Sequence, residues 1–206
     1  ANFSEGVIQS HARLTYSQAN ALVTQPKSKL AKTTAASSPA IVPHVKNLHA
    51  LFQVLLKQRK QRGAIDFETR ELALKLNKHK NIASISPLKR NDAHRMIEEF
   101  MLCANVATAQ FLQRHKIPSL FRVHSGPQQK KLTALRAFLT EKGLTLDGGD
   151  SPSSHHYNDL LKKVSHRPDA KLIQMLLLRS QSQAEYSPVN QGHFGLAYDA
   201  YAHFTS

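Results

Sequence analysis

Three polar side chains interrupt the longest apolar stretch of the sequence, residues 91–115. Arg95, Glu98 and Asn105 stand at positions i, i+3 and i+10, which places them with Leu102 along one side of an α-helix. A carboxylate in such a setting has to be paired, neutralised or used for binding. Two interpretations follow. Glu98 forms a structural ion pair with Arg95 or a neighbouring element, or the polar stripe faces a ligand channel.

The stretch around these side chains predicts a long, buried helix. Apolar residues occur on nearly every face, which is typical of a helix in a protein interior. Asn91 or Asp92 is suited to capping the first turn, and no Gly or Pro follows before Pro118. The single cysteine, Cys103, falls inside this helix, so the sequence offers neither a disulfide nor a thiolate metal site, and we expect a reducing compartment.

The composition indicates a folded protein with an anionic partner. The chain has 206 residues, 41% of them hydrophobic, which is enough for at least one full core. Its net charge is +14, and the basic excess is spread along the chain, which favours nucleic acid as a partner. A solvated cationic surface without such a partner is the alternative. No apolar run approaches the ~18 residues that cross a bilayer, so we expect no membrane partner.

The remaining patterns predict an α+β protein, with a mixed sheet packed by several α-helices. Alternation over 6–16 predicts a half-buried strand that carries Tyr16, and the Pro-, Ser- and Lys-containing text of 24–44 predicts an exposed loop. Cations followed by Gly63 predict the end of a helix. The other predicted elements are a short helix after Ser17, a helix from 45, a hairpin of 72–76 with 82–85, a strand at 119–124, and helices at about 132–142, 157–164 and 170–180.

Familiar catalytic motifs are missing from the sequence. It contains no P-loop, no GxGxxG after a strand, no GxSxG and no HExxH. The DGGD of Asp147–Asp150 is more typical of a surface turn than of a metal site. Metal-assisted hydrolysis of a nucleic acid requires several convergent carboxylates, and no such cluster is evident. We therefore predict no catalytic residue and no metal ligand in this chain.

Several side chains are nevertheless suited to holding a single nucleic-acid strand. Aromatic rings such as Tyr16 and Phe67 can stack on bases, although from sequence alone a core position is the commoner role for each of them. The carboxylate of Glu98 can accept a hydrogen bond from a ribose 2′-hydroxyl, a contact that distinguishes RNA from DNA.

Four motifs in order and in register resemble the catalytic RNB domain of the ribonuclease II and ribonuclease R family, and the match is closer to ribonuclease R. The resemblance runs from about Gly6 to Ser206, interrupted at 24–44, and implies the central portion of the α+β RNB fold. The motifs are DAHRMIEEFMLCANVATAQFL, PSLFRVH, RPDAKLIQMLLLRSQSQAEYSP and GHFGLAYDAYAHFTS. The segment MLLLRSQSQA departs from the family's usual MLLRSMSQA, which leaves the register of that helix open.

The resemblance implies a processive 3′→5′ exoribonuclease that releases nucleoside 5′-monophosphates with the help of a divalent metal, normally Mg²⁺. Tyr16 matches the family tyrosine near the terminal nucleotides, Phe67 the aromatic that clamps the stacked bases, and Glu98 the carboxylate that contacts a ribose hydroxyl. Asn105 and His193 lie in family motifs and are further RNA-binding candidates. The implied partners are single-stranded RNA 3′ ends and the remainder of the same enzyme chain, in the cytoplasm.

Two family features have no counterpart here. The metal-binding aspartates would precede Ala1, and the arginine segment that meets the scissile phosphate would follow Ser206. The flanking cold-shock and S1 domains are also outside the match. We therefore expect a partial RNB domain over 1–206 that is inactive in isolation. The alternatives are a non-catalytic RNA-binding or scaffolding protein with a degenerate RNB fold and, more weakly, DNA binding through charge alone.

Overall fold

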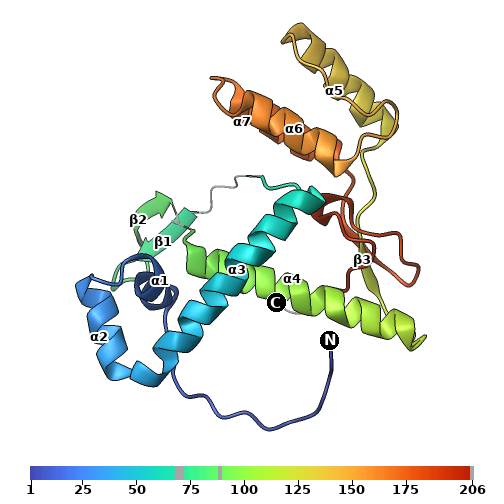
Figure 1. Ribbon diagram of the computed structural model, residues 1–206. Helices are drawn as coiled ribbons and strands as arrows, with labels where there is room; N and C mark the ends of the chain where they lie inside the picture. Colours follow the sequence, from blue (N-terminus) through green and yellow to red (C-terminus); the bar gives the residue numbers. More distant parts are fainter. Residues whose placement is uncertain (68–71, 88–89, 205–206) are drawn as a thin grey trace. The chain divides into compact units, whose positions relative to one another are not determined.

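The computed structural model describes residues 1–67, 72–87 and 90–204. Its elements are helices and short strands, with successive helices before β1 and after β3 (Figure 1). The helices are α1 (Tyr16–Thr24), α2 (Lys29–Ser37), η1 (Pro39–Ile41), α3 (Val42–Arg62), α4 (Asp92–Arg114), α5 (Gln129–Glu141), α6 (Ser154–Val164), α7 (Ala170–Ser180) and η2 (Phe194–Leu196). The strands are β1 (Leu72–Leu76), β2 (Ile82–Pro87), β3 (Phe121–Val123) and β4 (Glu185–Ser187).

The chain divides into two compact units. Unit 1 contains Ala1, Leu56–Phe67 and Met101–Ser206, and unit 2 contains Asn2–Leu55 and Glu68–Phe100. Helices α3 and α4 each contribute residues to both units. Across the described ranges, no helix combines the length and the apolar character that crossing a membrane requires.

Unit 1 is built around an apolar core that α5, α6 and α7 share. The phenol of Tyr157 is completely buried there, and its hydroxyl lies 2.8 Å from the Ser180 hydroxyl, so the one polar atom of this ring is paired. Gly143, with φ of +66°, ends the turn after α5. The buried members of the core are Ile65, Leu132, Leu135, Leu139, Leu146, Tyr157, Leu160, Val164, Ile173 and Leu177.

A second apolar cluster in unit 1 joins α4 to the C-terminal segment. Ala109 of α4 packs with Phe121 and Val123 of β3 and with two alanines near the C-terminus, Ala200 and Ala202. Strand β3 pairs with β4 in antiparallel register, and the backbone N–H of Arg122 donates to the Tyr201 carbonyl at 2.8 Å. The backbone that carries Tyr201 is therefore fixed against β3.

Unit 2 has a smaller core and an exposed hairpin. Ala21 and Leu22 of α1, Ala31 of α2 and Val45 of α3 form its buried cluster. Strands β1 and β2 pair in antiparallel register, with Leu74 opposite Ile85. The large apolar side chains of this hairpin, Leu72, Leu74, Leu76, Ile82 and Ile85, are each more than half exposed, at 54–62%.

The structure confirms the α+β class and most of the predicted helices and strands. The strands form two separate two-stranded antiparallel sheets. Helix α7 covers the predicted 170–180, α3 ends at Arg62 before Gly63, and β1 and β2 form the predicted hairpin. The DGGD segment is a turn in which Gly148 and Gly149 have positive φ.

Two predictions near the N-terminus are wrong. Residues 6–15 are not a strand, and Tyr16 instead opens α1 behind a capping box in which Thr15 and Gln18 exchange hydrogen bonds. The predicted loop at 24–44 contains α2, which Ser28 caps and which buries Ala31 and Thr34. Residues 6–15 alternate in polarity, but they pair with no strand in the described residues, so they form none. Helix α2 was missed because it buries only Ala31 and Thr34, too few positions to give a clear helical pattern.

Helix α4 is less buried than its composition predicted. Ile97 is 39% exposed, and Cys103 is also exposed rather than inside the protein. The buried polar residues of this helix are Glu99, at 5% exposure, and Asn105, at 0%. A helix apolar on nearly every face thus still presents one side to solvent.

Candidate nucleic-acid interface

Tyr16 forms a stacked pair with His94 in unit 2. The two ring centroids are 4.1 Å apart and the ring planes differ by 20°. Tyr16 remains 46% exposed, because the imidazole covers only part of the phenol ring. A ring that is held on one side and accessible elsewhere is suited to stacking on a planar ligand.

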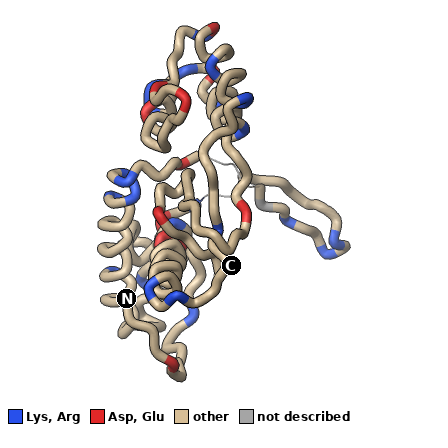
Figure 2. The backbone as a smooth tube through the Cα atoms, turned by 90° about the vertical axis from the view of Figure 1, so that its right-hand side faces the viewer, with Lys and Arg blue, Asp and Glu red and all other residues tan. Residues whose placement is uncertain are grey.

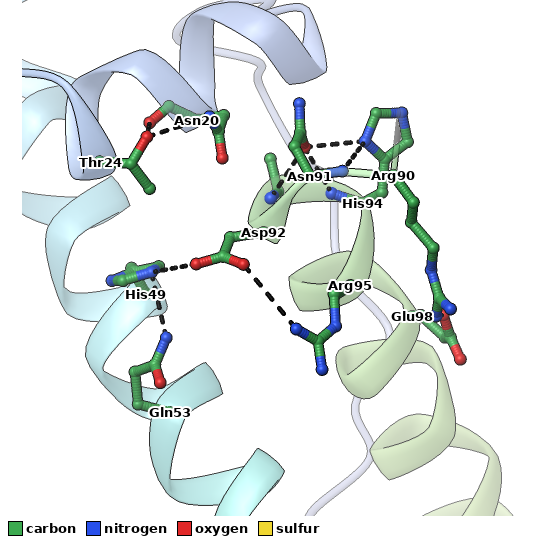
Figure 3. A network of polar contacts seen from close by, with 11 residues as sticks. Asn20, Thr24, His49, Gln53, Arg90, Asn91, Asp92, His94, Arg95 and Glu98 are labelled. Carbon is green, nitrogen blue, oxygen red and sulfur yellow. Dashed lines mark hydrogen bonds and ion pairs between the residues drawn. The ribbon is translucent and has the colours of Figure 1, made fainter. Parts of the chain in front are cut away.

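The orientation of His94 is set by the N-terminal cap of α4. The Asn91 side-chain oxygen accepts hydrogen bonds from the backbone N–H groups of Ala93, at 3.1 Å, and His94, at 3.2 Å (Figure 3). The same oxygen lies 2.8 Å from Nδ1 of His94. The backbone N–H of Asn91 also approaches this nitrogen, at 3.4 Å, so Asn91 contacts Nδ1 of His94 through both its side chain and its backbone. One asparagine therefore caps the helix, as predicted, and also fixes the imidazole under Tyr16.

Glu98 lies one helical turn beyond His94, on the same face of α4. Its carboxylate forms an ion pair with Arg90, and the side chains of Glu98 and Arg90 are 40% and 43% exposed (Figure 3). The carboxylate is thus held beside a cation and still reaches solvent. Tyr16, through its stack on His94, and Glu98 are consequently brought together by α4.

The predicted pairing of Glu98 with Arg95 is not present. A guanidinium nitrogen of Arg95 lies 4.0 Å from a carboxylate oxygen of Asp92, and the group is 5.9 Å from the Phe52 ring centroid. Asp92 also contacts His49 at 3.4 Å (Figure 3). Of the two sequence interpretations, the structural ion pair with a neighbouring segment describes Glu98, because its partner Arg90 precedes α4. The other interpretation, a stripe that faces a ligand channel, stays a prediction.

Asn105 and His193 meet at Tyr201 in unit 1. The Asn105 side-chain N–H donates to the Tyr201 hydroxyl at 2.9 Å, and that hydroxyl lies 3.1 Å from Nδ1 of His203. The His193 ring stands edge-on to the Tyr201 ring, with centroids 5.4 Å apart. Asn105 is completely buried, so it organises this cluster and is not itself open to a ligand.

Two neighbouring histidines in this cluster are held neutral. Burial, and secondly the neighbouring His124, lower the pKa of His193 from 6.5 to about 4. Burial also lowers the pKa of His124. Nδ1 of His193 accepts from the Leu196 backbone N–H at 3.2 Å, so the proton of the neutral ring is on Nε2.

His193 lines a cavity of about 580 Å³ that lies entirely within unit 1. The end of α3, the first turn of α6 and the loop of residues 190–199 form its walls. The loop is fixed by backbone bonds, among them the reciprocal pair between His193 and Tyr198 at 2.8 and 3.3 Å. A pocket of this volume is in the range that binds small organic ligands.

Arg62 forms one wall of the cavity. Its Nε–H donates to the Leu196 carbonyl at 3.1 Å, and its guanidinium carbon is 3.9 Å from the centroid of the Tyr198 ring. The terminal nitrogen Nη2 is shielded from solvent without an acceptor in the described residues. Next to it, Gly63 has φ of +82°, and a Cβ there would stand 2.5 Å from the His155 ring.

Phe67 is placed differently from the other candidates. It is partly buried and packs against the apolar core of unit 1. Its predicted role as a clamp for stacked bases stays a prediction.

Comparison with known proteins places this architecture in a family. The family model described as the RNB domain matches residues 1–206. The chain belongs to the RNB-domain family. Ribonuclease R of Vibrio cholerae is 46% identical over 202 residues, and ribonuclease R of Escherichia coli is 45% identical over 204 residues. These matches cover 98% and 99% of this chain but 24% of each relative, so the chain spans about a quarter of their length.

A solved RNB structure has the same fold. Mycoplasma genitalium RNase R in complex with ribose-methylated single-stranded RNA superposes with a TM-score of 0.78 at 29% identity. The match covers 93% of this chain and 29% of that one. The resemblance first recognised in four motifs therefore extends through nearly the whole RNB chain described here.

The described residues of this RNB chain do not fit the Mg²⁺ that the resemblance implies. Nowhere in 1–67, 72–87 or 90–204 do three His, Cys, Asp or Glu side chains converge in a way that could hold a metal ion.

Basic residues are spread over the backbone of both units of the RNB chain (Figure 2). Not all of them are available to a polyanion. Arg59 is only 7% exposed and lies 3.9 Å from Asp66, so it stabilises the end of α3. Arg90 is engaged by Glu98.

Sequence reasoning missed four residues that organise these sites. His94 was one turn from Glu98 on the same helix face, and that spacing could have revealed it. Arg62 was interpreted only as a helix-ending cation. His124 and Tyr201 come from segments 77 residues apart, and nothing in their local sequence indicates that both would lie against His193.

Proposed function

We propose that this chain forms the RNA-holding part of an enzyme that degrades single-stranded RNA processively from its 3′ end to nucleoside 5′-monophosphates. Its curated relatives are ribonuclease R proteins, and a structurally similar RNase R was solved with single-stranded RNA. The observation that carries the proposal is the accessible Tyr16 ring, stacked on His94 one helical turn from the solvent-facing Glu98 carboxylate.

In this proposal, the exposed part of the Tyr16 ring stacks on a base, and His94 prevents the phenol from turning away. Base stacking of this kind contributes about 1–3 kcal/mol per base and does not depend on base identity. Glu98 accepts a hydrogen bond from a ribose 2′-hydroxyl, while Arg90 orients the carboxylate. Tyr16 thus supplies affinity through its ring, and Glu98 supplies selectivity for ribose through its carboxylate.

The catalytic step is assigned to groups outside these 206 residues. Divalent metal, normally Mg²⁺, would activate the attacking water and stabilise the phosphate in the transition state. The remainder of the enzyme chain would supply the ligands of this metal. We place the whole enzyme in the cytoplasm. We expect the purified 206 residues with Mg²⁺ to release no nucleoside monophosphates from single-stranded RNA, as measured by chromatography of the products. Sustained release would contradict this assignment.

The proposal is tested by measuring the affinity of RNA and DNA oligomers of one sequence by fluorescence anisotropy. Tyr16→Ala should weaken both about 5- to 150-fold, the equivalent of 1–3 kcal/mol. Glu98→Gln should weaken RNA more than DNA, because only RNA has the 2′-hydroxyl. Glu141→Gln, which removes an exposed carboxylate at the end of α5, is the matched control.

Equal affinity of the wild type for both sugars would favour DNA binding through charge alone. RNA preference that survives Glu98→Gln would exclude the carboxylate as its source. The salt dependence gives a separate measure, since log affinity should fall with log salt at about −0.7 per phosphate neutralised on a single strand.

A further inference from the structure

A second hollow of unit 1, the α5–α7 groove, lies between helices α5 and α7 and has a volume of about 260 Å³. Its α5 side follows one face of that helix, because the lining positions there are spaced as i, i+3, i+4 and i+7. Most of the lining is apolar, and a cation stands on each side. The α5 side carries Lys131, Ala134, Leu135 and Phe138, and the α7 side is formed mainly by Leu176 and Arg179.

The apolar lining continues along the exposed side of α7. Leu172 and Met175 are 43% and 42% exposed. Counted from Leu172, the residues Met175, Leu176 and Arg179 stand at i+3, i+4 and i+7, so all four lie along one side of the helix. A pocket that merges with an exposed apolar strip is typical of a surface that contacts another molecule.

The rim of the α5–α7 groove is positive. Arg179 is exposed and belongs to a helix that contains no acidic residue. Lys131 is also exposed, and its ammonium approaches only the Gln181 carbonyl, at 3.4 Å. Two turns along α5, Nζ of Lys142 stands 5.8 Å from the centroid of the Phe138 ring. Within the described part of the chain, no Asp or Glu lines the groove. The charge is therefore complementary to an acidic partner.

The volume and the lining together indicate the class of occupant. At about 260 Å³ the groove is smaller than the roughly 300–1,000 Å³ of pockets that enclose a drug-sized ligand. Nucleic acids are held by cations along the phosphates and by aromatic platforms under the bases, and the aliphatic side chains of Leu135 and Leu176 supply neither. Apolar side chains that project from a helix fit such a groove, as in other complexes in which an amphipathic helix docks.

We propose that the α5–α7 groove docks an acidic amphipathic helix of a separate protein. The apolar face of that helix packs on Leu135, Phe138 and Leu176, and its carboxylates lie beside Lys131 and Arg179. Permanent interfaces are large and mostly apolar, whereas a small apolar patch with a charged rim is typical of a partner that binds and leaves. The inference adds a protein contact to the proposed function and does not depend on it.

The docking is measured by fluorescence anisotropy on the 206-residue chain. The probe is a labelled helical peptide of about 20 residues, with leucines at i, i+3, i+4 and i+7 and glutamates on both flanks. One control peptide has lysines in place of the glutamates, and the other has asparagines in place of the leucines. The acidic amphipathic peptide should bind about tenfold or more tightly than either control. Equal binding of the three peptides would overturn the proposal.

Two alanines of α5 provide a matched pair of variants. Ala134→Gln places a long polar side chain in the groove, and Ala137→Gln places the same side chain at an exposed position that does not line it. Glutamine is a good helix former, so both variants should fold. Ala134→Gln should weaken the acidic peptide about tenfold or more, and Ala137→Gln less than about twofold. Equal losses would remove the groove as the binding site.

The charge of the rim is tested by exchange. Arg179→Glu should weaken the acidic peptide about tenfold or more and strengthen the lysine peptide. Lys171→Glu makes the same change of charge on α7 at an exposed position outside the groove, and it should leave both affinities within about threefold. If Arg179→Glu weakened both peptides alike, charge complementarity would not be the basis of docking, and the proposal would fail.

Two other occupants are outcomes of the same titration. Single-stranded RNA that displaces the peptide, and that itself binds less tightly to the Ala134→Gln variant, would assign the groove to nucleic acid. Loss of peptide binding in the full-length enzyme would assign it to another segment of that enzyme. Either result overturns the proposal. The expected result is that the full-length enzyme binds the peptide with unchanged affinity, in the presence or absence of RNA.

Discussion

The two units differ in how they use apolar and polar side chains. Unit 1 buries ten residues in one cluster and pairs its polar groups inside it, as with Tyr157 and Ser180. The buried cluster of unit 2 has four residues, and the leucines and isoleucines of its hairpin are more than half exposed. Its polar candidates, Tyr16 and Glu98, are also accessible. We therefore expect unit 1 to contribute more to the stability of the fold, whereas unit 2 carries the solvent-accessible side chains that can contact a ligand.

The largest effect should come from the core of unit 1. Leu139 is completely buried, so Leu139→Ala should lower the free energy of unfolding by about 2–5 kcal/mol. The matched substitution in unit 2 is Leu74→Ala, at a side chain that is 59% exposed, and it should cost less than about 0.5 kcal/mol. Urea denaturation followed by circular dichroism measures both. Similar losses would remove the contrast between the units.

Acid should weaken unit 1 through His193. Its pKa is about 4 in the folded chain and 6.5 in its ordinary state, so the unfolded chain binds more protons between these values. The stability of the wild type should be unaffected by this group above pH 6.5, fall as the pH decreases, and level off below about 4. The full loss is up to about 3 kcal/mol.

His193→Gln should flatten the pH dependence in this window while leaving the contribution of His124, whose pKa is lowered in the same direction. Urea midpoints measured at intervals from pH 4 to 7 provide the comparison. An unchanged slope in the variant would assign the titration to other groups.

Two asparagines allow the contributions of a buried hydrogen bond in unit 1 and an exposed one in unit 2 to be compared. Asn105 is completely buried and donates to Tyr201, so Asn105→Ala should cost about 1–3 kcal/mol by leaving polar atoms unpaired. Asn20 bonds Thr24 at 3.0 Å on an exposed surface of unit 2, and Asn20→Ala should cost less than about 0.5 kcal/mol. Thermal unfolding of the two variants compares the sites. A larger loss at Asn20 would reverse the assignment of stability.

The smallest effect should come from the ion pair in unit 2. Arg90 and Glu98 are both partly exposed, and pairs of this kind contribute about 0–1 kcal/mol. Glu98→Gln should therefore leave the unfolding midpoint nearly unchanged while altering RNA binding. If stability instead fell by several kcal/mol, the carboxylate would be a structural residue of unit 2.

Sequence patterns predicted elements better than they predicted burial. The helical periods of α5, α6 and α7 and the hairpin were found because each signal is local. Residues 6–15 could not be decided, since a strand requires a partner that alternation does not reveal. The exposure of Cys103 was also missed, because an apolar composition does not show which face of a helix has neighbours.

The candidate sites were predictable to a similar degree. Two of the predicted RNA-binding residues, Glu98 and Tyr16, lie near one face of α4, Tyr16 through its stack on His94, and their role in binding stays a prediction. Their partners His94 and Arg90 were not predicted. A ring stack and an ion pair depend on the directions of the side chains, and residue spacing alone does not fix those directions. The cavity was beyond reach, since Arg62 and His193 stand 131 positions apart in the sequence.

Gly63 gives the cavity a sensitivity that reaches past its lining. The left-handed backbone there lets the His155 ring lie where any side chain would begin, and Asn158 of α6 donates to the Gly63 carbonyl at 2.8 Å. A methyl group at position 63 would have to adopt this left-handed backbone and would displace the exposed His155 ring, which is the far end of a side chain and can turn away. The cost of a substitution there would therefore fall on the backbone of residue 63 and on one imidazole, and the Asn158 bonds that join α6 to the end of α3 would remain.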